Sequence, residues 1–102
     1  MLADETLASQ DRHAPLSERS LSKLRWRCRR GLLENDLFIE RFFTRHADGL
    51  SARLADGMAR LMDLSDNDLL DLHLARKSLA EVDATLDTAD VREVLSMLIE
   101  PI

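Results

Sequence analysis

Apolar residues recur along most of this chain at the three- and four-residue intervals that place side chains on one face of an α-helix. Five segments carry this pattern, and short stretches with Ser, Thr, Asp or Gly, which are typical of helix ends, separate them. Only 4% of the residues are aromatic, and β-branched residues are sparse, so the strand-forming residue types are scarce. The pattern predicts an all-α protein, a small five-helix bundle.

The first predicted helix begins at Ser20, a good N-cap residue, and continues to Arg30, with Gly31 as its stop. At about 100° per residue, one face of this helix is apolar and the opposite face is charged. The apolar face carries Leu21, Leu24 and Cys28. The opposite face carries Arg19, Lys23, Trp26 and Arg30. The tryptophan is therefore expected to point outward among the charges.

The second predicted helix, from Leu32 to Ala47, is the expected centre of the core, because it contains all three phenylalanines. Its apolar positions surround most of the helix: Leu32, Leu33, Leu37, Phe38, Ile39, Phe42, Phe43 and Ala47. A narrow polar stripe remains, formed by Glu34, Arg41 and Arg45. Glu34 is expected to be exposed near Gly31.

Three more helices follow. The third begins after the N-cap Ser51 and carries an apolar stripe of Leu54, Met58, Leu61 and Met62. The fourth follows the capping pattern at Ser65 and is expected from Asp66 to Lys77. Residues 78–86 have weak periodicity and are predicted to be a loop. The last helix is expected to begin after residues 86–88 and to end before Pro101. The apolar residues expected to point inward from it are Val91, Val94, Leu95, Leu98 and Ile99.

The length of 102 residues allows one domain with a modest core. Residues 1–16 are polar and lack periodicity, which predicts a flexible N-terminal arm before a single helical domain at 17–102. The start of the chain resembles neither a secretory signal nor a transit peptide. No run of about 18 apolar residues occurs, so the expected location is the cytoplasm.

Candidate catalytic and metal-binding residues do not form a recognisable set. His13, His46 and His73 lie in three different segments and are expected to be surface or boundary histidines. The single cysteine, Cys28, excludes an internal disulfide and a Cys-based zinc site. The acidic stretch at 63–71 lacks the glycine and terminal glutamate of an EF-hand. Neither an enzyme nor a metal site is predicted.

Charge is distributed unevenly along the chain. Residues 1–30 carry 7 Lys and Arg against 4 Asp and Glu, a net charge of +3, whereas residues 31–102 carry 7 against 15, a net charge of −8. A nucleic-acid-binding protein needs a broad basic face, which the acidic majority of this chain opposes. The segment from Lys23 to Glu34 instead fits a protein interface, because Trp and Arg dominate interface hot spots. The alternative is that Trp26 merely covers part of a small core.

The segment Trp26-Arg27-Cys28-Arg29-Arg30-Gly31-Leu32-Leu33-Glu34 resembles the Arg-Gly-x-x-Glu signature of the small assembly factors that promote covalent flavin attachment to succinate dehydrogenase. The resemblance extends over about residues 20–100, with an aromatic second helix and an acidic turn before the fourth. It implies a five-helix bundle that binds the flavoprotein subunit of succinate dehydrogenase, and in some members that of fumarate reductase. Such a factor is chaperone-like and is not an enzyme.

The resemblance also implies which residues bind the partner: Trp26, Arg29, Arg30, Gly31 and Glu34. FAD is expected to be attached to the partner, with no cofactor bound stably by this chain. A bacterial protein is expected because no transit peptide is visible. Two other interpretations stay open, namely an antitoxin-like protein and a nucleic-acid-binding regulator that uses the basic first helix.

Overall fold

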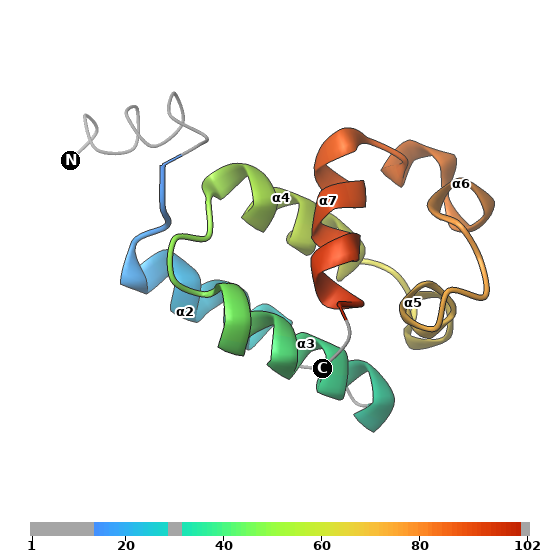
Figure 1. Ribbon diagram of the computed structural model, residues 1–102, viewed down its shortest axis with the longest axis horizontal. Coiled ribbons are helices and arrows are strands. Elements are labelled where there is room, and N and C mark those ends of the chain that lie inside the picture. The colour runs from blue at the N-terminus through green and yellow to red at the C-terminus, as the bar shows by residue number, and fades with distance from the viewer. Residues whose placement is uncertain (1–13, 29–31, 101–102) are drawn as a thin grey trace.

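A computed structural model of the chain describes residues 14–28 and 32–100. In these residues the chain forms six α-helices and one short 3-10 helix, and no strand longer than an isolated bridge (Figure 1). The elements are α2 (Glu18–Arg27), α3 (Leu33–His46), α4 (Ala52–Leu61), α5 (Asp66–His73), α6 (Leu79–Val82), η1 (Ala84–Leu86) and α7 (Ala89–Leu98). Five of the helices have eight or more residues. The prediction of a small all-α bundle is confirmed.

Side-chain caps explain where most of the helices begin. Ser51 and Ser65 each accept a hydrogen bond from the backbone N–H three residues later, as their sequence patterns predict. The predicted N-cap Ser20 is wrong, because Ser17 fills that role and accepts from the Ser20 N–H at 3.2 Å. Both positions are serines, and helix propensity cannot choose between two caps one turn apart.

Helix α5 ends at His73, so the predicted extension to Lys77 is wrong. Ala75 adopts a left-handed conformation with φ of 58°, which a helix cannot continue through. The backbone N–H groups of Arg76 and Lys77 turn back to the Asp71 carbonyl at 2.8 and 3.3 Å. Glycine usually occupies such a position, and an alanine there gives the sequence no stop signal.

Residues 78–86 are not the predicted loop but contain α6 and η1. A capping box starts α6: the Ser78 side chain accepts from the Glu81 N–H, and the Glu81 carboxylate accepts from the Ser78 N–H at 2.7 Å. Leu79 and Leu86 are buried. One helical turn is too short to show periodicity, although the Ser-x-x-Glu pattern of the capping box is visible in the sequence.

Residues 14–16 lie along residues 50–52 ahead of α2. The Leu16 N–H donates to the Leu50 carbonyl at 2.8 Å, and the Ala52 N–H donates to the Ala14 carbonyl at 3.3 Å. Pro15 and Ser51 form the isolated bridge between these segments. This end of the predicted arm therefore has backbone partners in the domain, while residues 1–13 lie outside the described part of the chain.

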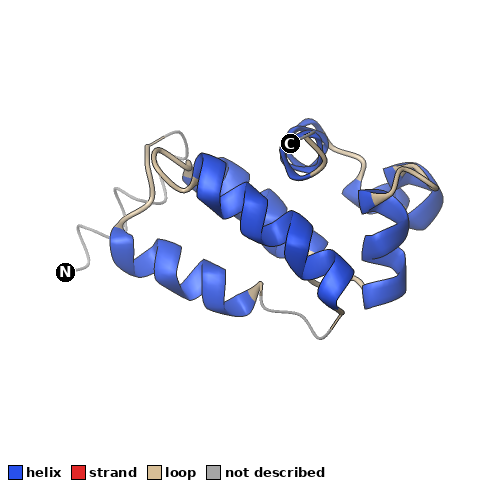
Figure 2. Cartoon of the chain, turned by 60° about the horizontal axis from the view of Figure 1, so that its bottom comes forward, coloured by secondary structure: helices blue, strands red, loops and turns tan. Residues whose placement is uncertain are grey.

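Buried side chains of α2, α3, α4, α5 and α7 form the core, and those of α3 lie on one side of that helix. Figure 2 shows how the helices are arranged. Ile39, Phe42 and Phe43 are buried, and the two phenylalanine rings meet edge to face with centroids 5.2 Å apart. Cys28 is fully buried beside them, as predicted. The predicted inward position of Ile99 is wrong, because this residue, the C-cap of α7, is exposed. On α3, Leu33 and Leu37 are also exposed.

Helices α4 and α7 pack most extensively against each other. Gly57 is buried at their contact, where a Cβ atom would lie 3.2 Å from Val94 Cγ2 and 3.3 Å from the Asp90 carbonyl oxygen. Arg53 also joins the two helices by donating to Asp90 at 2.6 Å and to Glu93 at 3.1 Å. The close approach of these helices depends on the missing side chain at Gly57.

Replacing Gly57 with valine is expected to lower the free energy of unfolding by about 1–3 kcal/mol, because the added methyl groups overpack this contact. The matched control is Ala89→Val, which introduces the same branched side chain at an exposed position of α7. Urea denaturation of the two variants and the unchanged protein measures the difference. An equal decrease in the free energy of unfolding of the two variants would show that stability does not depend on the close packing of Gly57 against α7.

Candidate partner-binding surface

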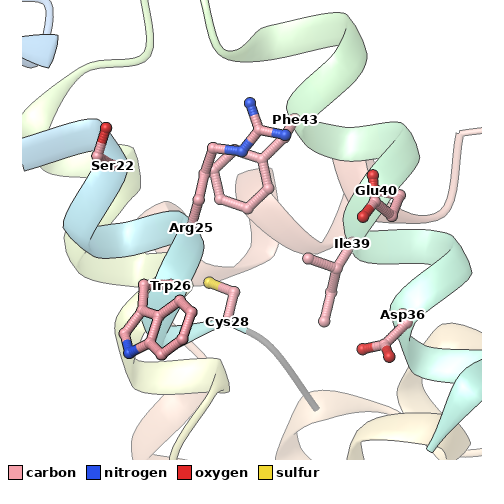
Figure 3. A pocket seen from close by; sticks show the side chains of 8 residues that line it. All are labelled: Ser22, Arg25, Trp26, Cys28, Asp36, Ile39, Glu40 and Phe43. Atoms are coloured by element: carbon pink, nitrogen blue, oxygen red, sulfur yellow. The ribbon is translucent and has the colours of Figure 1, made fainter.

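A groove of about 540 Å³ opens between α2 and α3, beside the segment that carries the predicted partner-binding residues (Figure 3). We call it the α2–α3 groove. Its lining is formed by Ser22, Arg25, Trp26, Cys28, Asp36, Ile39, Glu40 and Phe43. The two helices that form its walls follow one another in the chain. We use the name α2–α3 corner for the C-terminal end of α2 and the N-terminal end of α3.

The floor of the groove is apolar and its walls are charged. Cys28, Ile39 and Phe43 are buried and form the floor. On the α2 wall, the Arg25 guanidinium lies over the Phe43 ring, 5.2 Å from its centroid (Figure 3), a cation–π arrangement. On the α3 wall, Asp36 and Glu40 are one helical turn apart. The groove therefore combines apolar contact area with charges of both signs.

Trp26 lies at the edge of the groove with 73% of its surface exposed. The alternative that this tryptophan covers part of the core is therefore wrong, and its predicted outward position is confirmed. A large, rigid aromatic side chain held at the border of a groove with an apolar floor is the type of residue that anchors protein interfaces. Folding does not require this exposure, since Leu24 and Cys28 supply the buried contacts of α2.

Glu34 is exposed, as predicted, but it does not line the groove. It precedes Asp36 by two residues, which turns it about 200° around the helix. It shares a face with Phe38, whose ring stacks on His73 of α5 with centroids 4.6 Å apart. The structure thus places Trp26 and Glu34 on different sides of the α2–α3 corner. The other predicted site residues, Arg29, Arg30 and Gly31, lie outside the described residues.

A buried polar network fixes the first turns of α3 against α5. Asn35 is fully buried, and its side-chain amide donates to the Asp66 carbonyl at 3.0 Å. Its oxygen lies 2.9 Å from His73 Nδ1, and because an amide oxygen can only accept, His73 donates from Nδ1. His73 is 3% exposed, so the prediction of a surface or boundary histidine is wrong here. Periodicity does not reveal this pair, since neither residue is apolar.

The other histidines and acidic residues considered above for catalysis or metal binding have structural roles where the structure describes them. His46 is a boundary residue, as predicted, and its Nε2 lies 2.9 Å from the Glu100 carboxylate. That contact is the main reason why the pKa of Glu100 lies below its usual value. Asp63 pairs with Arg27, and Asp71 pairs with Arg76. His13 lies outside the described residues. Among the residues that the structure describes, none form a His, Cys, Asp and Glu group that could hold a metal ion.

Comparison with known proteins identifies relatives of this chain. A family model described as "Flavinator of succinate dehydrogenase" matches residues 22–98. The chain belongs to this family. A protein of Ralstonia nicotianae named "FAD assembly factor SdhE" is 52% identical over 77 residues, which cover 76% of this chain and 78% of the relative. A protein of Coxiella burnetii with the same name is 39% identical over 49 residues, 48% of this chain and 60% of the relative. No solved structure matches the chain significantly.

The family match begins within α2 and ends at the last residue of α7. It includes every residue that lines the α2–α3 groove, from Ser22 to Phe43. The segment predicted as an N-terminal arm, 1–16, lies outside it. Within the described residues, no helix is long and apolar enough to cross a membrane.

Removing the Asn35 amide is expected to destabilise the protein by about 1–3 kcal/mol, because the buried His73 Nδ1–H then loses its acceptor. Asn35→Ala tests this, and the matched control is Asn67→Ala at an exposed position of α5. Thermal and urea denaturation of both variants measures the loss. A change no larger than that of the control would mean that the network does not hold α3 against α5.

Proposed function

We propose that this protein is an assembly factor that binds the flavoprotein subunit of succinate dehydrogenase and promotes covalent attachment of FAD to that subunit. The observation that carries the proposal is the 52% identity to a relative named "FAD assembly factor SdhE", over 77 residues. The match of residues 22–98 to the flavinator family supports it independently. The flavoprotein of fumarate reductase is a second partner within this proposal.

The proposed role is that of a chaperone and not of an enzyme. A binding protein accelerates a reaction on its partner if it binds the reactive conformation more tightly than the others. Stabilising one arrangement of the flavin pocket is sufficient for this, and it needs no nucleophile or general base on the factor. The apolar floor and exposed Trp26 of the α2–α3 groove support a binding role. We place this activity in the bacterial cytoplasm.

The proposed partner-binding residues are those that match the family signature: Trp26, Arg29, Arg30, Gly31 and Glu34. Trp26 supplies apolar contact area, and Gly31 permits close approach of the partner backbone. Arg30 and Glu34 provide charges that fix orientation. Trp26 and Glu34 lie on different sides of the α2–α3 corner. The partner is therefore expected to contact both of these sides.

Substituting Gly31 with arginine or Glu34 with alanine is expected to abolish assembly activity without unfolding the protein. Neither change removes core volume, so stability should change by at most about 1–2 kcal/mol. Loss of a hot-spot contact weakens binding by about 2 kcal/mol or more. The assay is in-gel fluorescence of covalent flavin on the succinate dehydrogenase flavoprotein, in cells that lack their own factor and express each variant.

The control for this assay is Glu18→Ala, an equivalent truncation at an exposed position in the first turn of α2 and outside the groove, which should restore flavin attachment fully. Circular dichroism establishes that all variants remain helical. Full rescue by both Gly31→Arg and Glu34→Ala would assign the motif a purely structural role at the helix corner. Failure of the unchanged protein to rescue would overturn the proposed function itself.

We also expect the purified protein to be colourless, because it acts on flavin in the partner and binds none stably. Asp36 and Glu40 on the α3 wall of the groove repel the pyrophosphate of FAD. Visible absorbance and mass spectrometry of the protein as purified test this expectation. Stoichiometric flavin in the preparation would contradict it and would indicate a flavin carrier.

A further inference from the structure

Two leucines on α3 are exposed, although this helix contributes buried aromatic residues to the core. Leu33 and Leu37 have 68% and 56% of their surface exposed. They are one turn apart and form an apolar ridge, which we call the α3 ridge, on the side of the helix opposite the buried Asn35 and Ile39. Large exposed apolar side chains that are adjacent on one face mark interaction surfaces, whereas scattered ones do not.

Acidic residues border the α3 ridge on both sides. Leu37 lies three residues from Glu34 and three from Glu40, so each glutamate is its direct neighbour on the helix surface. Both glutamates are exposed and make no hydrogen bond or ion pair in the described part of the chain. Arg41, on the same helix, is directed to an aromatic ring, because its guanidinium lies over the Phe38 ring, 4.9 Å from the ring centroid. The ridge is thus an apolar stripe between two available carboxylates.

The α3 ridge is continuous with the surface proposed above to bind the partner. Glu40 borders the ridge and also lines the α2–α3 groove, while Glu34 borders the ridge and belongs to the predicted motif. Trp26, Leu33 and Leu37 are three of the five large apolar side chains that are exposed among the described residues. All three lie where α2 is followed by α3. A partner that covers Glu34 and Trp26 must therefore also cover the ridge.

We infer that the α3 ridge docks an amphipathic helix of the flavoprotein partner, one whose apolar stripe is bordered by lysine or arginine. This inference rests on the proposed function. A ridge of side chains four residues apart fits the groove between equivalent rows on a second helix. Basic residues at the border of that helix pair with Glu34 and Glu40, and this complementary charge sets its orientation.

Binding of the purified flavoprotein subunit to the full chain tests the inference. The double variant Leu33→Gln with Leu37→Gln removes the apolar ridge and keeps residues that favour helix. The matched control is Leu74→Gln, an exposed leucine on another part of the surface. Isothermal titration calorimetry should show affinity reduced at least about ten-fold for the double variant, as for interface hot spots, and unchanged for the control. Circular dichroism verifies that both remain folded.

A second arm of the experiment tests the charge of the partner helix. Glu40→Lys should weaken binding more than Glu40→Gln, because it places a like charge against the basic border. Raising the salt concentration from about 0.1 to about 1 M should weaken binding of the unchanged protein more than that of Glu40→Gln, since salt screens exposed charges. Tighter binding by Glu40→Lys would overturn the assignment of a basic partner.

The outcomes separate the inference from the function on which it rests. If the unchanged protein binds the flavoprotein and the double leucine variant binds equally well, the inference is overturned and the proposed function stands. If the unchanged protein does not bind the flavoprotein, both are overturned. Sedimentation that shows dimers of the unchanged protein and monomers of the double variant would assign the ridge to a second copy of this chain, and would also overturn the inference.

Discussion

Burial of one side of α3 is the constraint on which the rest of this small structure depends. Phe42 and Phe43 are the two buried aromatic residues of the core, and Ile39 is buried on the same side of α3. A chain of 102 residues forms only one modest core, and buried residues of α2, α4, α5 and α7 complete it around this side of α3. The pair of Asn35 and His73 then fixes the direction of α3 relative to α5.

Because only one side of α3 is buried, its other side is available for partner binding. Once one side has filled the core, the first two turns can expose Leu33 and Leu37 without loss of packing. Exposed apolar residues on α3, the neighbouring Trp26 and the groove between α2 and α3 form one continuous region of the surface. A small assembly factor can in this way combine a rigid helical support with a large contact area. The rigidity of the support lowers the entropy cost of binding.

The distribution of charge on this region can orient a bound partner. Basic residues are concentrated before residue 31 and acidic residues after it, so the α2–α3 corner is where the two signs meet. In the described part of the chain, Arg25 forms one wall of the groove and Asp36 and Glu40 form the other. A partner with both signs of charge is oriented by such a surface, whereas a uniformly charged polymer is not. The arrangement suits a folded protein partner better than nucleic acid.

The sequence by itself determined the helical class, the caps at Ser51 and Ser65 and the family, because these depend on local periodicity, side-chain hydrogen bonds and a short motif. It placed Trp26 on the charged face of its helix, and the structure decided that this side chain is exposed. Tertiary structure decided which side of α3 is buried, since apolar residues surround that helix and only its neighbours select a side. It also decided the stop of α5 at Ala75 and the burial of His73. The left-handed turn at Ala75 occurs without the glycine that would signal it. The polar pair of Asn35 and His73 joins helices that are distant in the sequence, so no local pattern predicts it.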